Sequence, residues 1–230
     1  MVEYWDIGLA LLLSYLLGSV PCGLLIVKIA SGKDIREVES GRTGGTNAMR
    51  AAGFLAGLTT AAFDLSKGAA TALIVDAIAP GLPWVRVAAA LLAILGHNYS
   101  VFLIEKTTHG RLRLRGGAGG ATALGGAIAL WPVSGLIIFP LVALTYVFIG
   151  YASVTTISIT VFAFLVFAVR AALGLSPWIY ALYGVLALLV VLWALRPNLK
   201  RLREGTERPV GLRAARLKKT NGNNHAIQSK

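Results

Sequence analysis

The chain has 230 residues, of which 56% are hydrophobic and only 14% are charged, so it is too apolar to present an ordinary water-soluble surface. Apolar stretches long enough for a hydrocarbon core of about 30 Å recur along it, which predicts an all-α integral membrane protein, a bundle of about seven transmembrane helices, some short or broken. The 22 Lys and Arg residues outnumber the 10 Asp and Glu residues, so anionic lipid, anionic substrates and nucleic acid are the partners to weigh.

The first apolar run, from Ile7 to Ala30, is too long for a signal-peptide core and lacks a basic start, so we expect a retained first helix. A polar loop of about twenty residues follows, from Ser31 to Arg50. The next apolar stretch, from Ala51 to Ala79, contains Asp64 and Lys67 at positions i and i+3. This pattern predicts a broken helix or two short helices, with an ion pair between the two charges.

The second half of the chain divides at prolines and glycines. After the turn at residues 80–83, Trp84 to Ile104 is expected to form a full span, followed by a basic segment from Glu105 to Arg115 and a glycine-rich stretch at residues 116–120. The nearly uncharged region from Ala123 to Leu175 is expected to form three helices, with divisions at Trp131–Pro132 and at Gly150–Tyr151. A last helix should begin at Ser176–Pro177 and end near Leu195.

The charges predict the topology and the domain boundary. Basic residues concentrate in the two loops and in the C-terminal segment, whereas residues 1–6 and 76–83 contain none, so the basic segments should face the cytoplasm and the N-terminus should lie outside. We expect residues 1–200 to form the membrane domain and residues 201–230 to form a basic cytoplasmic tail, disordered toward its polar end.

The loop segment from Ser40 to Arg50 combines glycine, hydroxyl, amide and guanidinium groups just ahead of a helix. Such a loop can bind a phosphate, because glycines let main-chain N–H groups approach an anion and arginine offers bidentate hydrogen bonds. A solvated turn with cytoplasmic arginines is the alternative.

A second candidate site combines His97, near the end of a span, with the glycine-rich stretch that follows the second basic segment. A histidine in a membrane helix is costly to leave unpaired, so it is a candidate general base or hydrogen-bond donor; a purely structural histidine is the alternative. The glycine-rich stretch lacks the Gly-Lys-Ser/Thr ending of a Walker A motif. His109 and His225 have no metal-ligand spacing around them, and we assign no metal site.

Considered together, these segments resemble the bacterial glycerol-3-phosphate acyltransferases that use an acyl phosphate as donor. The resemblance covers nearly the whole chain. It is carried, in order, by residues 18–21, 33–36, 40–50, 64–68, 96–98, 116–122, 153, 198–202 and 205–207.

This resemblance implies a seven-helix enzyme of phospholipid biosynthesis in the bacterial plasma membrane. It would transfer a fatty acyl group from acyl phosphate to the 1-hydroxyl of glycerol 3-phosphate on the cytoplasmic side, giving lysophosphatidic acid. The resemblance implies no cofactor, metal or nucleic acid, and a monomer is expected. The implied catalytic residues are His97, Ser40, Asn47 and Ser153. The implied phosphate-binding residues are Arg42, Arg50, Arg115, Gly116, Gly117, Gly119, Thr122 and Asn198.

The chain departs from the family pattern within the proposed site. Where the family has a lysine among the glycines, this chain has Ala118, and Arg42 stands where the family usually has asparagine. We predict that Arg42 or Arg115 supplies the missing charge. Two other functions remain open: a divergent, non-catalytic relative that binds anionic lipid or phosphate, and a small organic-anion transporter.

Overall fold

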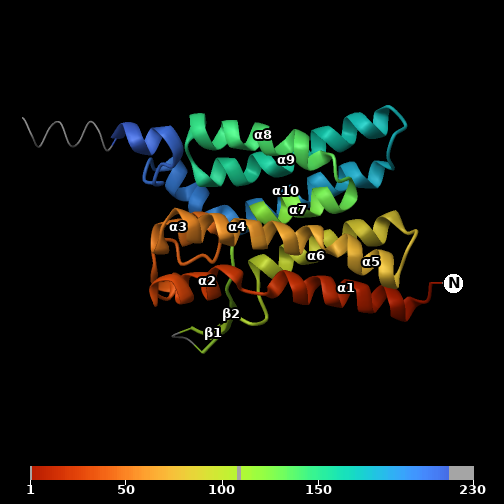
Figure 1. Ribbon diagram of the computed structural model, residues 1–230, viewed down its shortest axis with the longest axis horizontal. Helices are drawn as coiled ribbons and strands as arrows, with labels where there is room; N and C mark the ends of the chain where they lie inside the picture. Colours follow the sequence, from red (N-terminus) through yellow and green to blue (C-terminus); the bar gives the residue numbers. More distant parts are fainter. Residues whose placement is uncertain (1, 108–109, 218–230) are drawn as a thin grey trace, which may run out of the picture.

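Helices running along the long axis of the molecule make up most of the structure, a computed structural model that describes residues 2–107 and 110–217 (Figure 1). The helices are α1 (Tyr4–Ser19), α2 (Cys22–Ser31), α3 (Gly45–Ala52), α4 (Phe54–Ala69), α5 (Thr71–Ile78), α6 (Pro83–Asn98), α7 (Gly120–Leu130), α8 (Ser134–Leu144), α9 (Ala152–Ala172) and α10 (Trp178–Arg203). A 3₁₀ turn at Ile35–Glu37, a π-helical turn at Thr145–Ile149, and strands β1 (Ile104–Lys106) and β2 (Leu112–Leu114) complete the described elements.

These helices make seven passes along the bundle: α1 with α2, α4 with α5, α6, α7, α8 with its π-helical extension, α9, and α10. Three of the segments, Tyr4–Ser31, Ala152–Ala172 and Trp178–Arg203, are long and apolar enough to cross a membrane unaided. The others are shorter or interrupted, as the sequence predicted.

The first pass is not the continuous helix predicted from Ile7 to Ala30. It breaks between Ser19 and Cys22, where Val20 and Pro21 leave the helical conformation. Proline has no N–H for the helical ladder and disfavours helical geometry in the residue before it, which explains the break at this place.

The second pass consists of two helices, as predicted, but Asp64 and Lys67 lie inside the first of them and the division falls after them, at Ala70. α4 ends at Ala69 and α5 begins at Thr71, whose hydroxyl donates to the Gly68 carbonyl at 2.8 Å. α4 packs directly on α7 at Gly68, where a Cβ would overlap the Thr122 carbonyl oxygen. This contact at a glycine brings the two backbones together and holds the charged part of α4 beside the start of α7.

The span predicted from Trp84 to Ile104 was too long. α6 ends at Asn98, and the chain then forms the antiparallel hairpin β1–β2, with Ile104 opposite Leu114 and Glu105 opposite Arg113. The hairpin contains the two strands found among the described residues, and an isolated β-bridge joins Tyr151 to Pro209. Isolated two-stranded hairpins are marginal in water, and the ion pairs of Glu105 described below hold this one against the bundle.

The remaining helices divide where proline and glycine predicted, at Trp131 and at Gly150. A core lies between α7, α9 and α10, where Phe167 and Tyr183 are fully buried and the Tyr183 hydroxyl donates to the Ala123 carbonyl at 2.6 Å. This core holds α7, α9 and α10 together.

α10 continues to Arg203 instead of ending near Leu195, so the boundary predicted at residue 200 falls inside a helix. Beyond it the chain folds back: Val210 N–H donates to the Gly150 carbonyl at 2.8 Å, and Glu207 is buried. Residues 218–230, which contain the end of the predicted tail, lie outside the described residues.

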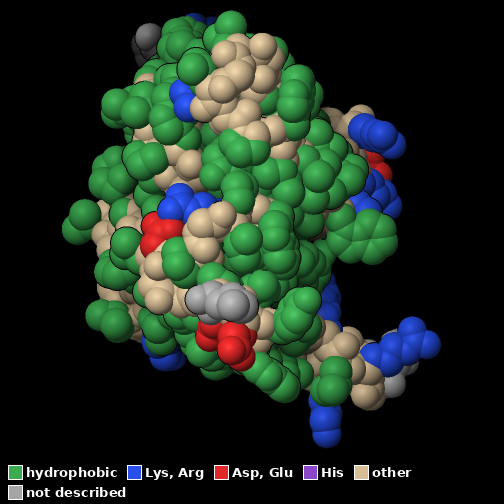
Figure 2. All heavy atoms as spheres, turned by 90° about the vertical axis from the view of Figure 1, so that its right-hand side faces the viewer, with side chains coloured by type: hydrophobic (Ala, Val, Ile, Leu, Met, Phe, Trp, Pro, Cys, Tyr) green, Lys and Arg blue, Asp and Glu red, His purple; other side chains and the backbone are tan. Residues whose placement is uncertain are grey.

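The first loop, the hairpin and the C-terminal segment lie toward the same end of the bundle, as the charge pattern predicted (Figure 1). Contacts join them: Arg36 pairs with Glu105 at 3.1 Å, and Arg208 pairs with Glu39 at 2.5 Å. Figure 2 views the opposite end, which hydrophobic side chains largely cover. The structure is therefore polarised, with a basic end and an apolar end.

Candidate functional site

The glycine segment at residues 116–119 lies against the end of α6. Gly117 N–H donates to the His97 carbonyl at 2.9 Å. A Cβ on Gly116 would overlap the His97 carbonyl oxygen, and a Cβ on Gly117 would overlap His97 Nε2. Glycine is thus required at both positions, because the main chain passes too close to α6 for any side chain.

Gly119 and the first turn of α7 complete this segment. Gly119 caps the helix with φ of 85°, in the left-handed region that favours glycine. The first N–H groups of α7 have no acceptor within the helix, and its N-terminus carries a partial positive charge. This is a geometry in which main-chain donors can bind an anion.

Asn47 organises the first loop. Its side-chain amide donates to the carbonyls of Ile35, Val38 and Arg42, at 3.1, 2.9 and 2.8 Å. Asn47 is buried and these three contacts close the loop on itself, so the structure gives it a loop-shaping position. Ser40 also lies in the loop, where its hydroxyl accepts from Arg42 N–H at 3.4 Å.

Arg42 connects the first loop to two other segments. Its Nη1 donates to the Gly117 carbonyl at 2.9 Å and its Nη2 donates to the Ala194 carbonyl in α10. Burial lowers the pKa of the Arg42 guanidinium below its ordinary value, and the nearby charge of Arg201 lowers it further. A bound phosphate would relieve both effects by supplying negative charge.

Arg115 belongs to a surface ion-pair network. Its Nε lies 2.6 Å from Glu105, whose other carboxylate oxygen pairs with Arg36, and Arg36 also pairs with Asp34 at 2.6 Å. The hydrogen bond from Arg36 lowers the pKa of Asp34. Arg115 is therefore already neutralised, whereas Arg42 contacts only main-chain carbonyls.

His97 lies behind the glycine segment and is 5% exposed. Its Nδ1 is 3.4 Å from Asp64 Oδ1, and the same oxygen is 2.9 Å from Lys67 Nζ. This confirms the predicted ion pair between Asp64 and Lys67. Lys67 also donates to the Val20 carbonyl at the break between α1 and α2, at 3.0 Å. The buried charges thus join α4, α6 and the first pass.

Ser153, in the first turn of α9, is fully buried and contacts the folded-back C-terminal segment. Its hydroxyl donates to Glu207 Oε2 at 2.5 Å, and its N–H donates to Glu207 Oε1 at 3.2 Å. Arg50 is exposed in α3, and its Nη2 donates to the Arg208 carbonyl at 3.5 Å. Both residues contact the folded-back C-terminal segment.

Several buried polar atoms near these elements have no hydrogen-bond partner among the described residues. Buried polar atoms are normally paired, so such a group indicates a polar ligand or ordered water. The atoms are Thr122 Oγ1, Asn198 Oδ1, Asn47 Oδ1 and both side-chain polar atoms of Asn98.

The structure brings most of the predicted residues to one end of the bundle, in two groups. The first loop, the glycine segment, His97 and Thr122 are mutually packed, while Ser153 and Arg50 meet the C-terminal segment. Sequence reasoning missed the links made by Glu105 and Glu207, because nothing in the sequence pairs a carboxylate with a distant partner. Within the described residues, no group of three His, Cys, Asp or Glu side chains could hold a metal ion.

Known proteins resemble this chain over nearly its full length. A family model for glycerol-3-phosphate acyltransferases matches residues 8–205. A glycerol-3-phosphate acyltransferase of Thermus thermophilus is 43% identical over 204 residues, which cover 88% of this chain and 94% of the relative. The enzyme of that name from Rubrobacter xylanophilus is 42% identical over 209 residues, which cover 90% of this chain and 96% of the relative.

Solved structures agree with the fold. The crystal structure of PlsY, an integral membrane glycerol 3-phosphate acyltransferase, in its glycerol 3-phosphate form matches with a TM-score of 0.74 at 31% identity, covering 89% of this chain and 96% of that one. Its lysophosphatidic acid form matches with a TM-score of 0.72 at 30% identity. These matches confirm the predicted all-α, multi-pass integral membrane fold, and the chain belongs to the glycerol-3-phosphate acyltransferase family.

Proposed function

We propose that this protein transfers a fatty acyl group from acyl phosphate to the 1-hydroxyl of glycerol 3-phosphate, giving lysophosphatidic acid. The observation that carries the proposal is the junction at Arg42, where the first loop, the glycine segment and α10 meet around one cation. Both substrates carry phosphate, and a guanidinium beside main-chain N–H groups is suited to bind it.

The chemistry requires little beyond positioning. An acyl phosphate is a mixed anhydride with a good leaving group, so the protein need only align the acceptor hydroxyl and neutralise the phosphates. We assign phosphate binding to Arg42 and the first turn of α7. Asn198, whose buried Oδ1 has no partner among the described residues, is assigned to accept a hydrogen bond from the hydroxyl of glycerol 3-phosphate. Arg50 is the second phosphate-binding candidate, at the exposed edge.

His97, Asn47 and Ser153 receive positioning roles. His97 supports the glycine segment from behind, Asn47 shapes the first loop, and Ser153 fixes the C-terminal segment through Glu207. No serine nucleophile is needed. The active site would lie on the cytoplasmic side of the plasma membrane, because the basic end of the bundle is expected to face the cytoplasm.

The alternatives, a non-catalytic phosphate-binding relative and an organic-anion transporter, are less favoured, since relatives named as acyltransferases cover most of the chain. Turnover decides between them. Purified protein incubated with palmitoyl phosphate and glycerol 3-phosphate is expected to form lysophosphatidic acid, and palmitoyl-CoA in place of palmitoyl phosphate is expected to give none. Absence of lysophosphatidic acid with both donors would refute the proposal.

A further inference from the structure

Helix α10 has two faces of different character. Its inner face packs in the bundle and carries Ala194 and Asn198, which belong to the proposed active site. Its outer face is exposed, with residues spaced by three or four positions. In chain order these exposed residues are Leu182, Val185, Leu189, Trp193, Arg196, Lys200 and Arg203. The outer face is therefore apolar along most of the helix and cationic over its last two turns.

The length of α10 places this change in character at a membrane surface. Trp178, at the start of the helix, is 64% exposed, and Trp193 is 59% exposed. Exposed tryptophans mark the two interfaces of a bilayer. Arg196 follows Trp178 by eighteen residues, or about 27 Å of helix, close to the thickness of a hydrocarbon core of about 30 Å. The cationic turns thus reach the level of the lipid headgroups.

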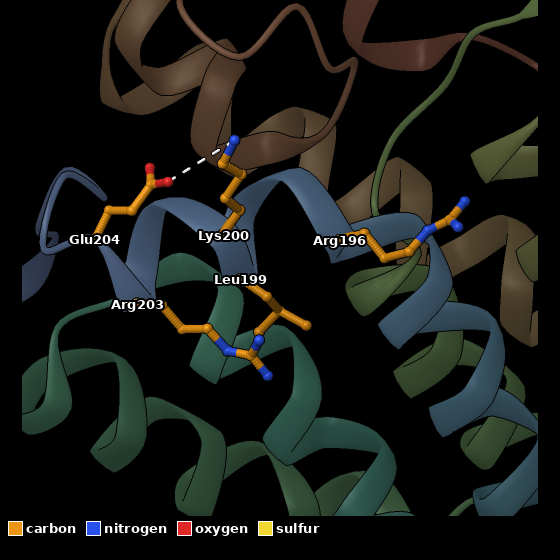
Figure 3. Close-up of a pocket in the computed structure, with 5 residues that line it drawn as sticks. All are labelled: Arg196, Leu199, Lys200, Arg203 and Glu204. Carbon is orange, nitrogen blue, oxygen red and sulfur yellow. Dashed lines mark ion pairs between the residues drawn. The ribbon is translucent and has the colours of Figure 1, made fainter.

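A pocket of about 460 Å³ lies at these turns, lined by Arg196, Leu199, Lys200, Arg203 and Glu204 (Figure 3). The lining residues carry three cations and one carboxylate, so their net charge is positive, and of the three cations only Lys200 approaches Glu204 (Figure 3). The Lys200–Glu204 pair is long, at 3.8 Å, and both side chains are more than half exposed, so it leaves Lys200 available. Arg203 has no ion-pair partner among the residues that the structure describes.

Arg196 is held in place by Trp193. The guanidinium carbon stacks 3.3 Å from the centroid of the indole ring, and Arg196 Nε donates to the Trp193 carbonyl at 3.1 Å. Stacking and one hydrogen bond fix the side chain and leave both terminal nitrogens without a partner in the described part of the chain. These nitrogens are oriented as a fork that can bind a phosphate.

We propose that this pocket binds the phosphate headgroup of an anionic bilayer phospholipid, whose acyl chains lie along the apolar stripe above it on α10. The combination of a cationic pocket and a continuous exposed apolar stripe on one helix face favours a lipid over a soluble phosphate. The site is separate from the proposed active site, since Asn198 and the Ala194 contact of Arg42 lie on the opposite face. It does not depend on the proposed activity.

Nanodiscs test this proposal. The protein is reconstituted in phosphatidylcholine with increasing phosphatidylglycerol, and the thermal midpoint and the anionic lipid retained in native mass spectrometry are measured. The test variant replaces the three pocket cations (Arg196→Gln, Lys200→Gln, Arg203→Gln). It is expected to weaken the apparent affinity for phosphatidylglycerol about ten-fold or more, since each basic residue contributes to lipid attraction.

The control variant removes the same charge from the exposed hairpin at the same end of the bundle (Lys106→Gln, Arg111→Gln, Arg113→Gln), and it is expected to respond like wild type. An equal loss in both variants would mean unspecific attraction and would overturn the proposal, as would an unchanged pocket variant. Displacement of the retained lipid by inorganic phosphate would also overturn it, in favour of a soluble ligand. Lipid retention is measured on folded protein, so lowered stability alone cannot imitate the expected result.

Discussion

The guanidinium group of Arg42 is held in position by hydrogen bonds to two main-chain carbonyls, one in the glycine segment and one in α10. Two arginines were predicted to replace the lysine that the family carries at the position of Ala118. Arg115 is already paired with Glu105 at 2.6 Å, so its charge is largely compensated. Arg42 is the better placed of the two, and it contacts the main chain of the segment from which the lysine is missing.

Arg42→Ala is expected to reduce acyl-phosphate turnover by about 2 to 5 kcal/mol in transition-state stabilisation, the cost of removing one partner of a buried charge pair. Arg115→Ala should cost much less, because Arg115 serves the hairpin. Steady-state kinetics with palmitoyl phosphate measure both. Equal losses would show that Arg42 has no special role at the junction.

A lysine restored at position 118 should compensate for the lost arginine. Ala118→Lys is expected to recover part of the activity of Arg42→Ala, whereas Ala118→Gln, which adds length without charge, should not. If both replacements recover activity equally, charge is not the missing property. If wild type is inactive and Ala118→Lys alone creates activity, Arg42 does not replace the lysine.

The close passage of Gly117 over His97 leads to another test. Gly117→Ala places a methyl group where His97 Nε2 lies, and the imidazole cannot move freely because it is buried beside Asp64. Overpacking of this kind costs about 1 to 3 kcal/mol, so the thermal midpoint and the turnover should both fall. Gly8→Ala, at a helical position with no atom near the new Cβ, should leave turnover unchanged and not lower the thermal midpoint, because alanine favours a helix more than glycine does.

At the scale of the element, the folded-back C-terminal segment is attached to α9 through a carboxylate. Glu207 accepts from both the hydroxyl and the N–H of Ser153, and its charge lies at the N-terminus of a 21-residue helix. Glu207→Gln is expected to cost about 1.5 to 3 kcal/mol of stability, the range for hydrogen bonds to charged groups. The exposed Glu204→Gln serves as control, and an equal thermal shift for both would contradict the assignment.

Element divisions were predictable where they depend on local chemistry. Proline and glycine marked the end of α7 and the end of the π-helical turn after α8, whereas the charges of Asp64 and Lys67, which predicted an interruption, lie inside α4. Pro21 is the same kind of signal, but the apolar run around it predicts one continuous helix. The β1–β2 hairpin and the fold-back after α10 were not predictable, because each is held by a residue far away in the sequence: Arg36 pairs with Glu105 in the hairpin, and the Gly150 carbonyl accepts from Val210 N–H.

The candidate site was predictable as a set of segments but not as a geometry. Composition made the first loop a candidate for anion binding beside the alternative of a solvated turn, the glycine segment gave only a weak signal, and the family resemblance selected the residues. Periodicity could not show that His97 lies behind the glycine segment or that Ser153 contacts Glu207. Such placements arise from packing between helices that are far apart in the sequence.

At the scale of the whole molecule, the separation of a basic end from an apolar end predicts the orientation in the membrane. In a Cys22→Ser background, cysteines introduced at Lys33 and Arg111 should react with an impermeant reagent only from the cytoplasmic side. A cysteine at Gly81, in the turn between α5 and α6, should react only from outside. Labelling of position 111 from outside would reverse the orientation and the side of the proposed active site.

The shortness of α7 has a consequence for how two unlike substrates could meet. Its 11 residues extend about 16 Å, half of a hydrocarbon core of about 30 Å. The neighbouring α9 and α10, with 21 and 26 residues, are long enough to span that core. Because α7 cannot span this core, one of its ends lies below the level of the headgroups. We expect that end to be its start, where the glycine segment is largely buried by protein. A donor with a fatty tail could reach this depth sideways while its tail stays in the bilayer, and a small water-soluble acceptor would descend from the cytoplasm. In such a recess the two substrates could meet while the acyl tail of the donor stays in the bilayer and the acceptor stays in water.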